Sequence, residues 1–147
     1  MKYILTAIIL IATFAGAQSI SPPVIEYKKA AGKVVKGELT ISNMSVTALR
    51  YSLEGAPFRD SVMQSIHLTL DETSGKLRPK DTRTIGYKIV CDTEPCWLAI
   101  IATFTGMHTT EGLAVNLRLD QAVYICANQE HGCREQIRKD VFKIEGK

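Results

Sequence analysis

The longest regular pattern in this chain is an alternation of apolar and polar residues from Leu113 to Ile125. Side chains that repeat every two residues lie on one face of a β-strand, so this stretch predicts a strand with one apolar face. The apolar positions, interrupted only at Gln121, are Leu113, Val115, Leu117, Leu119, Val123 and Ile125. Ordinary strands have about five or six residues. A strand this long is either part of an internal core or a strand that one protein lends to another.

Shorter stretches of the same kind precede it, separated by turn residues. They predict strands at Val34–Ser42, Leu49–Leu53, Ile66–Leu70 and Thr82–Val90. A first strand at Ile20–Tyr27 is expected at an edge or with an irregular path, because Pro22 and Pro23 cannot donate to a ladder. Trp97–Phe104 is apolar on both faces, which predicts a central strand. About seven strands without a long helical pattern predict an all-β fold, a single immunoglobulin-like antiparallel sandwich.

Two positions in this pattern carry specific expectations. Gly37 falls on the inward face of its strand, where a missing side chain permits a bulge or a close neighbour. Asn43-Met44-Ser45 follows that strand and has two interpretations: a turn that needs Asn, or a glycosylation acceptor in an exported chain.

The two ends of the chain differ from its middle. Residues 1–17 combine a basic start, an apolar run from Ile4 to Ala15 and the small-residue end Ala15-Gly16-Ala17, which predicts a secretory signal peptide. The apolar run is short for a membrane span of about twenty residues, so an uncleaved anchor is the less favoured interpretation. The expected sandwich domain is 18–127. Residues 128–147 are largely polar, and we expect a short helix or a loosely attached extension there.

Charge argues against some partners. The chain has 18 Lys and Arg against 15 Asp and Glu, a formal net charge of +3. Loss of Lys2 with the signal peptide lowers this by one, to +2. A charge balance this even, with no basic run, excludes a nucleic-acid binder that depends on phosphate neutralisation.

Four cysteines stand in the expected mature chain: Cys91, Cys96, Cys126 and Cys133. In an exported protein an even count predicts two disulfides. The simplest pairing is local, because a Pro-containing turn separates Cys91 from Cys96 and a polar loop separates Cys126 from Cys133. A Cys96–Cys126 link is the rival pairing. A metal site formed by Cys126, His131 and Cys133 with an earlier cysteine is a third, less favoured possibility.

No residue pattern predicts catalysis. The chain lacks a Gly-x-Ser-x-Gly elbow, a phosphate-binding Gly-rich loop and a His-Glu-x-x-His motif. Its three histidines, His67, His108 and His131, fall on outward or loop positions. We therefore expect a protein that is not an enzyme and needs no cofactor.

Three segments together resemble a known family: Val34–Ser45, Lys76–Ile89 and Leu98–Tyr124. Their order is an edge strand, a strand ending in an Ile-Ser-Asn turn, a Pro-containing polar turn before an alternating strand, and a final long hairpin. This order is similar to the amino-terminal immunoglobulin-like domain of the PapD-like periplasmic pilus-assembly chaperones. That family has a second sandwich domain, so the resemblance implies a single-domain relative.

The resemblance also implies a binding site. In that family the last strand of the domain completes the sandwich of a pilus subunit, and basic residues hold the subunit's terminal carboxylate. Carried over to this chain, the donor residues are Leu113, Val115, Leu117 and Leu119, and Arg118 is the basic residue on that strand. The first strand has no Arg or Lys, and Lys28 and Lys29 come directly after it.

Two functional hypotheses follow. The first is a periplasmic or secreted chaperone-like module that recognises exported protein segments, such as a pilin-like subunit, by β-strand addition. The second is a disulfide-stapled secreted or envelope-associated structural or adhesion domain without chaperone activity. Neither requires nucleic acid or a membrane span in the mature chain, and the sequence sets no oligomeric state.

Overall fold

The computed structural model describes residues 18–56, 66–93, 95–106, 116–127 and 133. The elements in this part of the chain are nine strands. They are β1 (Gln18–Ser21), β2 (Val24–Lys28), β3 (Val35–Asn43), β4 (Leu49–Ala56), β5 (Ile66–Leu70), β6 (Ser74–Leu77), β7 (Thr82–Cys91), β8 (Cys96–Gly106) and β9 (Asn116–Cys126). No helix among the described residues is long and apolar enough to cross a bilayer.

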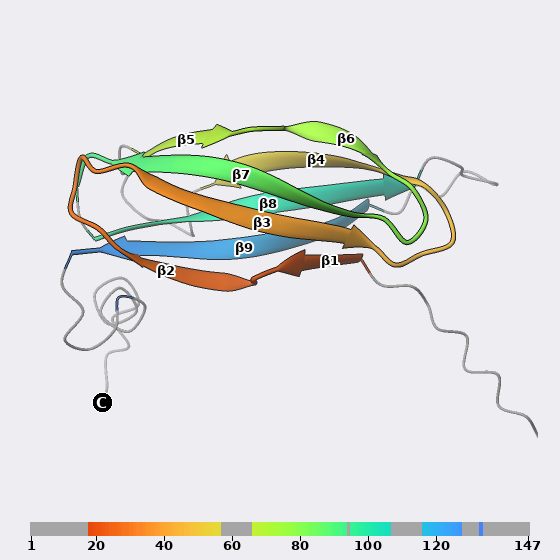
Figure 1. The fold of residues 1–147 in the computed structure, drawn as a ribbon, viewed down its shortest axis with the longest axis horizontal. Helices are drawn as coiled ribbons and strands as arrows, with labels where there is room; N and C mark the ends of the chain where they lie inside the picture. Colours follow the sequence, from red (N-terminus) through yellow and green to blue (C-terminus); the bar gives the residue numbers. More distant parts are fainter. Residues whose placement is uncertain (1–17, 57–65, 94, 107–115, 128–132, 134–147) are drawn as a thin grey trace, which may run out of the picture.

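The strands form two sheets that face each other (Figure 1). One sheet has four strands in the order β1-β3-β7-β5, and the other has five in the order β2-β9-β8-β4-β6. Neighbours are antiparallel except β2 and β9, which run parallel. The all-β immunoglobulin-like sandwich expected from the sequence is thus confirmed, with one parallel pair that the pattern did not indicate.

The core lies between the sheets and is built from the alternating positions of β3, β4, β7, β8 and β9. β8 sits in the middle of its sheet, and its residues from Cys96 to Ala102 are buried on both faces, as its continuous apolar sequence predicted. The expected close neighbour of Gly37 is also present. A Cβ at that position would lie 2.0 Å from the Tyr27 hydroxyl and 2.5 Å from Cζ of Tyr87.

The first expected strand, Ile20–Tyr27, is two strands in different sheets. β1 pairs with β3, and after Pro22-Pro23 the chain crosses to pair with β9 as β2. The side-chain phase changes at the crossing, because Ile20 and Ile25 both pack against the core although they are five positions apart. In one continuous strand they would face opposite sides.

Along the opposite lateral side, the chain passes from β5 of the first sheet to β6 of the second. The strand β6 was not predicted, because its four residues include Ser74 and Gly75, which resemble a turn. It pairs with β4 and buries Leu77 completely.

Asn43 is fully buried at the end of β3. Its amide nitrogen donates to the carbonyl oxygens of Thr47, Leu77 and Arg78 at 2.8, 3.3 and 3.1 Å, and its side-chain oxygen accepts from the amide and hydroxyl of Ser45. These bonds support the turn interpretation, since the nitrogen that a glycan would modify is enclosed in the folded chain.

The cysteines form two local disulfides, Cys91–Cys96 and Cys126–Cys133. The first joins the end of β7 to the start of β8, so it links the two sheets at one end of the sandwich. The second packs against Trp97. The local pairing is confirmed and the rival Cys96–Cys126 link is wrong. Cys126 and Cys133 are consumed in the bridge, no metal-binding group occurs among the described residues, and His131 lies outside them.

Candidate strand-addition edge

β9 is the strand on which the sequence placed the binding residues, and only part of it is paired on both sides. β8 pairs with it from Asn116 to Ile125. β2 pairs with its other side, but only from Ala122 to Cys126. Within the described chain, the outer side of Asn116–Gln121 therefore has no hydrogen-bonded strand partner, although β1 lies close to β9. We call this stretch the open edge.

The backbone of the open edge presents regularly spaced hydrogen-bonding groups. The Ala122 amide donates to the Pro23 carbonyl at 2.8 Å, and the Cys126 carbonyl accepts from Lys29 at 3.1 Å, so even-numbered residues of β9 direct their amide and carbonyl groups away from β8. By the alternation of a strand, Asn116, Arg118 and Asp120 do the same. An edge of this kind is a template for another strand.

The side chains along the open edge divide into two rows. Leu117 and Leu119 lie on the core-facing side, Leu117 with 36 % of its surface exposed and Leu119 half-buried against the core. Arg118 is exposed on the outer face opposite Thr103. The structure thus places three of the five predicted binding residues along one edge. Leu113 and Val115 lie outside the described residues.

The crossing at Pro22-Pro23 is what leaves the edge open, because it carries the preceding residues to β3. Gln121 holds this crossing: it is fully buried, and its amide nitrogen donates to the Pro22 carbonyl at 2.7 Å. Its side-chain oxygen is buried without a hydrogen-bond partner among the described residues. Sequence reasoning treated Gln121 only as an interruption. A polar residue in an otherwise apolar row was the available signal.

The basic residues that the family resemblance suggested do not come together. Lys28 pairs with Cys126 at the far end of β9 from the open edge, and Arg118 lies opposite Thr103. A two-cation anchor for a carboxylate is therefore not formed by Lys28 or Lys29 with Arg118.

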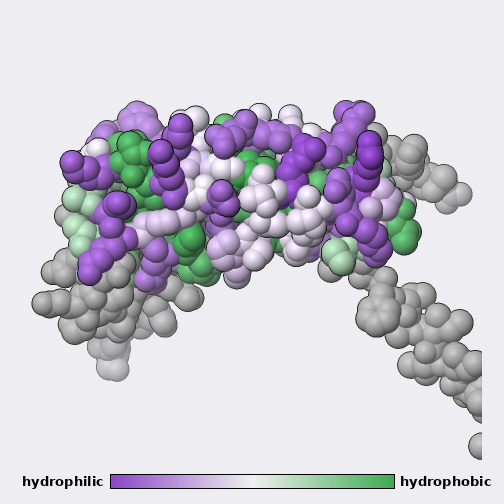
Figure 2. Space-filling model, viewed as in Figure 1, coloured by the Kyte–Doolittle hydropathy of each residue, from purple (hydrophilic) through white to green (hydrophobic). Residues whose placement is uncertain are grey.

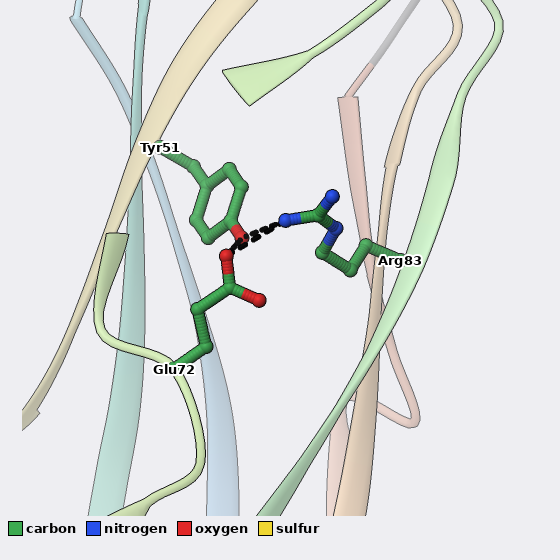
Figure 3. A network of polar contacts seen from close by, with 3 residues as sticks. All are labelled: Tyr51, Glu72 and Arg83. Atoms are coloured by element: carbon green, nitrogen blue, oxygen red, sulfur yellow. Dashed lines mark hydrogen bonds and ion pairs between the residues drawn. The ribbon is translucent and has the colours of Figure 1, made fainter. Parts of the chain in front are cut away.

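A polar network closes the opposite lateral side of the sandwich, where the chain passes from β5 to β6 (Figure 3). The Tyr51 hydroxyl donates to the Glu72 carboxylate at 2.5 Å, and the Arg83 guanidinium donates to the same carboxylate at 2.7 Å and to the Tyr51 oxygen at 3.1 Å. Tyr51 belongs to the five-stranded sheet and Arg83 to the four-stranded sheet, so Glu72 joins the two. Burial, followed by the hydrogen bond to Glu72, raises the pKa of Tyr51.

Comparison with known proteins gives structural matches only. No protein-family model matches the chain, and no curated protein sequence matches it. The PapD-like domain 7 of human CEP192 matches with a TM-score of 0.53 and 14% identity over 76% of this chain and 87% of that one. The Caenorhabditis elegans MSP-domain-like protein SSP-19 matches with a TM-score of 0.54 and 8% identity over 74% and 99%.

Periplasmic pilus chaperones also match. The Salmonella enterica complex of SafA pilin with the SafB chaperone gives a TM-score of 0.54 and 12% identity, over 88% of this chain and 63% of that one. Five chaperone chains among the matches are covered over 54% to 65% of their own length. The likeness establishes a fold shared with PapD-like and MSP-like domains, and the chain spans less than two thirds of the chaperones.

Proposed function

We propose that this protein is a chaperone-like binding module that recognises exported protein segments by β-strand addition at the open edge of β9. The observation that carries the proposal is the unpaired side of Asn116–Gln121, beside an exposed Leu117. The structural likeness to periplasmic chaperones supports it, and one matched complex contains a pilin.

Backbone pairing explains how such a site accepts an extended client. The outward amide and carbonyl groups of Asn116, Arg118 and Asp120 supply affinity that is independent of the client sequence. Leu117 and Leu119 select apolar residues at alternate client positions, which sets the register. The proposed partner-binding set is Leu113, Val115, Leu117, Arg118 and Leu119. The partner is an exported protein or a pilin-like subunit, and binding requires no cofactor or chemical step.

An extracytoplasmic location agrees with this role. Two disulfides form within the described chain, and such bonds persist in oxidising compartments. Residues 1–17, proposed as a signal peptide, would direct the chain to the periplasm or the exterior.

The test separates the contribution of the open edge's backbone to client binding from that of its side chains. Arg118→Pro removes one outward amide donor but no hydrogen bond to β8, because the Arg118 amide points away from that strand. Arg118→Ala removes the same side chain and keeps the amide. The client is a pilin-like subunit lacking one strand of its sandwich, and the readouts are suppressed aggregation and a one-to-one complex in size-exclusion chromatography.

Strand addition predicts that Arg118→Ala retains the complex and Arg118→Pro loses it, while urea unfolding shows both variants folded. Equal complex formation by the two variants would show that backbone pairing at this edge is not used. If the unmodified protein forms no complex, the proposal fails and the structural or adhesion domain remains.

A further inference from the structure

The end of the sandwich where β3 finishes carries a compact group of cationic and apolar side chains, which we call the basic tip: Met44, Val46, Lys76, Arg78 and Lys80. The turns that follow β3 and β6 meet there, since Ser42 pairs with Thr82 and Leu49 with Leu77. Both turns lie at the right-hand end in Figure 1. Among the described residues, these two turns form this end, and both can touch a flat surface at once.

The two turns are held together as one unit. Buried Asn43 donates to carbonyl groups of both, as described above, and the Asn43 amide donates to the Asp81 carbonyl at 2.9 Å. The Lys80 ammonium donates to the Met44 carbonyl. The arrangement of the tip is therefore fixed by the fold.

Lys80 occupies an unusual backbone position. The Asp81 amide donates to the Arg78 carbonyl at 3.1 Å, which closes a turn with Pro79 second and Lys80 third. The φ of Lys80 is 63°, a value that such a turn normally gives to Gly or Asn. A cation thus stands where the backbone favours a smaller residue, which is a reason to look for a role of its charge.

A pocket of about 610 Å³ opens between the turns. Its charged lining is Lys76, Arg78, Lys80 and Arg83 against Asp81. Arg83 is engaged by Glu72. The side chains of Lys76 and Arg78 are exposed and form no hydrogen bond or ion pair with another described residue. Their positive charge is available to an external anion.

Exposed apolar residues adjoin these cations. Among the described residues four large apolar side chains are exposed, and two of them, Met44 at 46% and Val46 at 81%, belong to the turn after β3. Leu117, the second residue of the open edge, lies at the same end. Figure 2 shows hydrophobic and strongly hydrophilic residues side by side at the right-hand end. A soluble anion would not be stabilised by the apolar side chains of Met44 and Val46.

We propose that the basic tip binds the surface of an anionic phospholipid bilayer, a property beyond the proposed recognition of protein segments. Lys76, Arg78 and Lys80 contact lipid phosphates, and Met44 and Val46 enter the boundary between headgroups and acyl chains. Cations beside apolar side chains are the combination that interfacial binding requires. A domain held in this way presents the start of the open edge next to the membrane.

Vesicle sedimentation tests the proposal with the purified full chain. Binding to phosphatidylcholine vesicles that contain phosphatidylglycerol should exceed binding to pure phosphatidylcholine and should fall with added salt. Lys76→Gln and Arg78→Gln should each lower the partition coefficient roughly fivefold. Val46→Ser should lower it roughly tenfold. Lys80→Gly removes a charge and the hydrogen bond to the Met44 carbonyl while relieving the backbone, so it should lower binding with little change in stability.

The matched control is the pair Lys36→Gln and Lys88→Gln, which removes two exposed charges from the other half of β3 and β7. All variants share the same N-terminus, so differences between them report the tip alone. The proposal is overturned if the control lowers binding as much as the tip variants, or if Val46→Ser has no effect. Binding of the tip to polyglutamate but not to anionic vesicles would identify an acidic protein segment as the partner and would also overturn it.

Discussion

Tyr27 and Tyr87 meet over Gly37 in the interior of the sandwich. Their hydroxyl groups share a hydrogen bond of 2.9 Å, and they occupy the space that a side chain at Gly37 would fill. The sequence predicted an inward glycine with a close neighbour but not the identity of that neighbour. Tyr27 lies on β2, whose passage into the second sheet was not expected, so the contact could not be inferred before the crossing was known.

The burial of Tyr87 in this contact makes the unfolding free energy fall at alkaline pH. Burial, followed by the hydrogen bond to Tyr27, raises the pKa of Tyr87 far above its ordinary value of 10.0. The folded protein keeps that proton where the unfolded chain loses it. The stabilisation is thus complete below pH 10 and is lost as the pH rises toward the raised pKa, by up to about 1.4 kcal/mol per pH unit for one group.

Tyr87→Phe should therefore reduce the decline of unfolding free energy between pH 10 and 11, measured by urea denaturation. Tyr51, whose pKa burial also raises, keeps part of the slope in the variant. Identical slopes in the variant and the unmodified protein would show that Tyr87 does not titrate differently on folding.

At the scale of elements, the apolar period located most strands, because one face of each is buried. The period failed where strand pairing, rather than burial of one face, decides whether and where a strand forms. β6 has four residues and few apolar positions. The crossing between β1 and β2 did leave a signal, namely the change of phase between Ile20 and Ile25. Pro22 and Pro23 also fit one irregular strand, so the phase change alone does not predict a crossing.

β9 shows why the apolar period could not separate core residues from the proposed binding surface. Leu117 and Leu119 have the same phase and the same residue type, but Leu119 packs against the core and Leu117 is more exposed. The difference in exposure is decided by how far each leucine lies from the end of the sandwich. The apolar period does not report that distance.

The two leucines should respond differently to a charge. Leu117→Lys should change the unfolding free energy by about 0.5 kcal/mol or less, because the ammonium reaches solvent. Leu119→Lys should lower it by about 2 kcal/mol or more, because a charged group enters the core margin. Urea denaturation measures both. Under the proposed function Leu117→Lys also abolishes client capture while the domain stays folded; similar destabilisation by both variants would assign the whole row to the core.

At the scale of the molecule, the described chain changes sheet along both lateral sides, from β1 to β2 on one and from β5 to β6 on the other. Glu72 fixes one crossing through Arg83 and Tyr51, and Gln121 fixes the other through the Pro22 carbonyl. Neither could be predicted, because the partners come from distant parts of the sequence. The crossing at Pro22-Pro23 determines function in our proposal, since the position at which β2 begins sets the length of the open edge.

The register of β2 shows what would close that edge. Val24 pairs with Ala122, and the same register continued backward sets Gln18 opposite Asn116 and Ser21 opposite Leu119. A straight first strand would therefore cover the open edge. It would also turn Ile20 outward and place Ser19 and Ser21 inward, since Ile25 and Tyr27 fix the inward phase. The side-chain phase and the two prolines both oppose closure.

A variant that reverses the side-chain phase and replaces the two prolines should close the edge. It combines Pro22→Ala and Pro23→Ala with Ser19→Val, Ile20→Ser and Ser21→Val, so that a continuous strand has an apolar inner row. We expect slow hydrogen exchange at the amides of Arg118 and Asp120 in this variant and fast exchange in the unmodified protein, together with loss of client capture.

The variant with the two Pro→Ala changes alone is the control for this experiment, because Ile20 still favours β3 and the amides should exchange fast. Protection of Arg118 and Asp120 in the unmodified protein would mean that another part of the chain already covers the edge. Strand addition would then require that cover to leave first. Fast exchange in the unmodified protein and in the control, with protection only in the closed variant, would show that the phase of three side chains keeps the edge available.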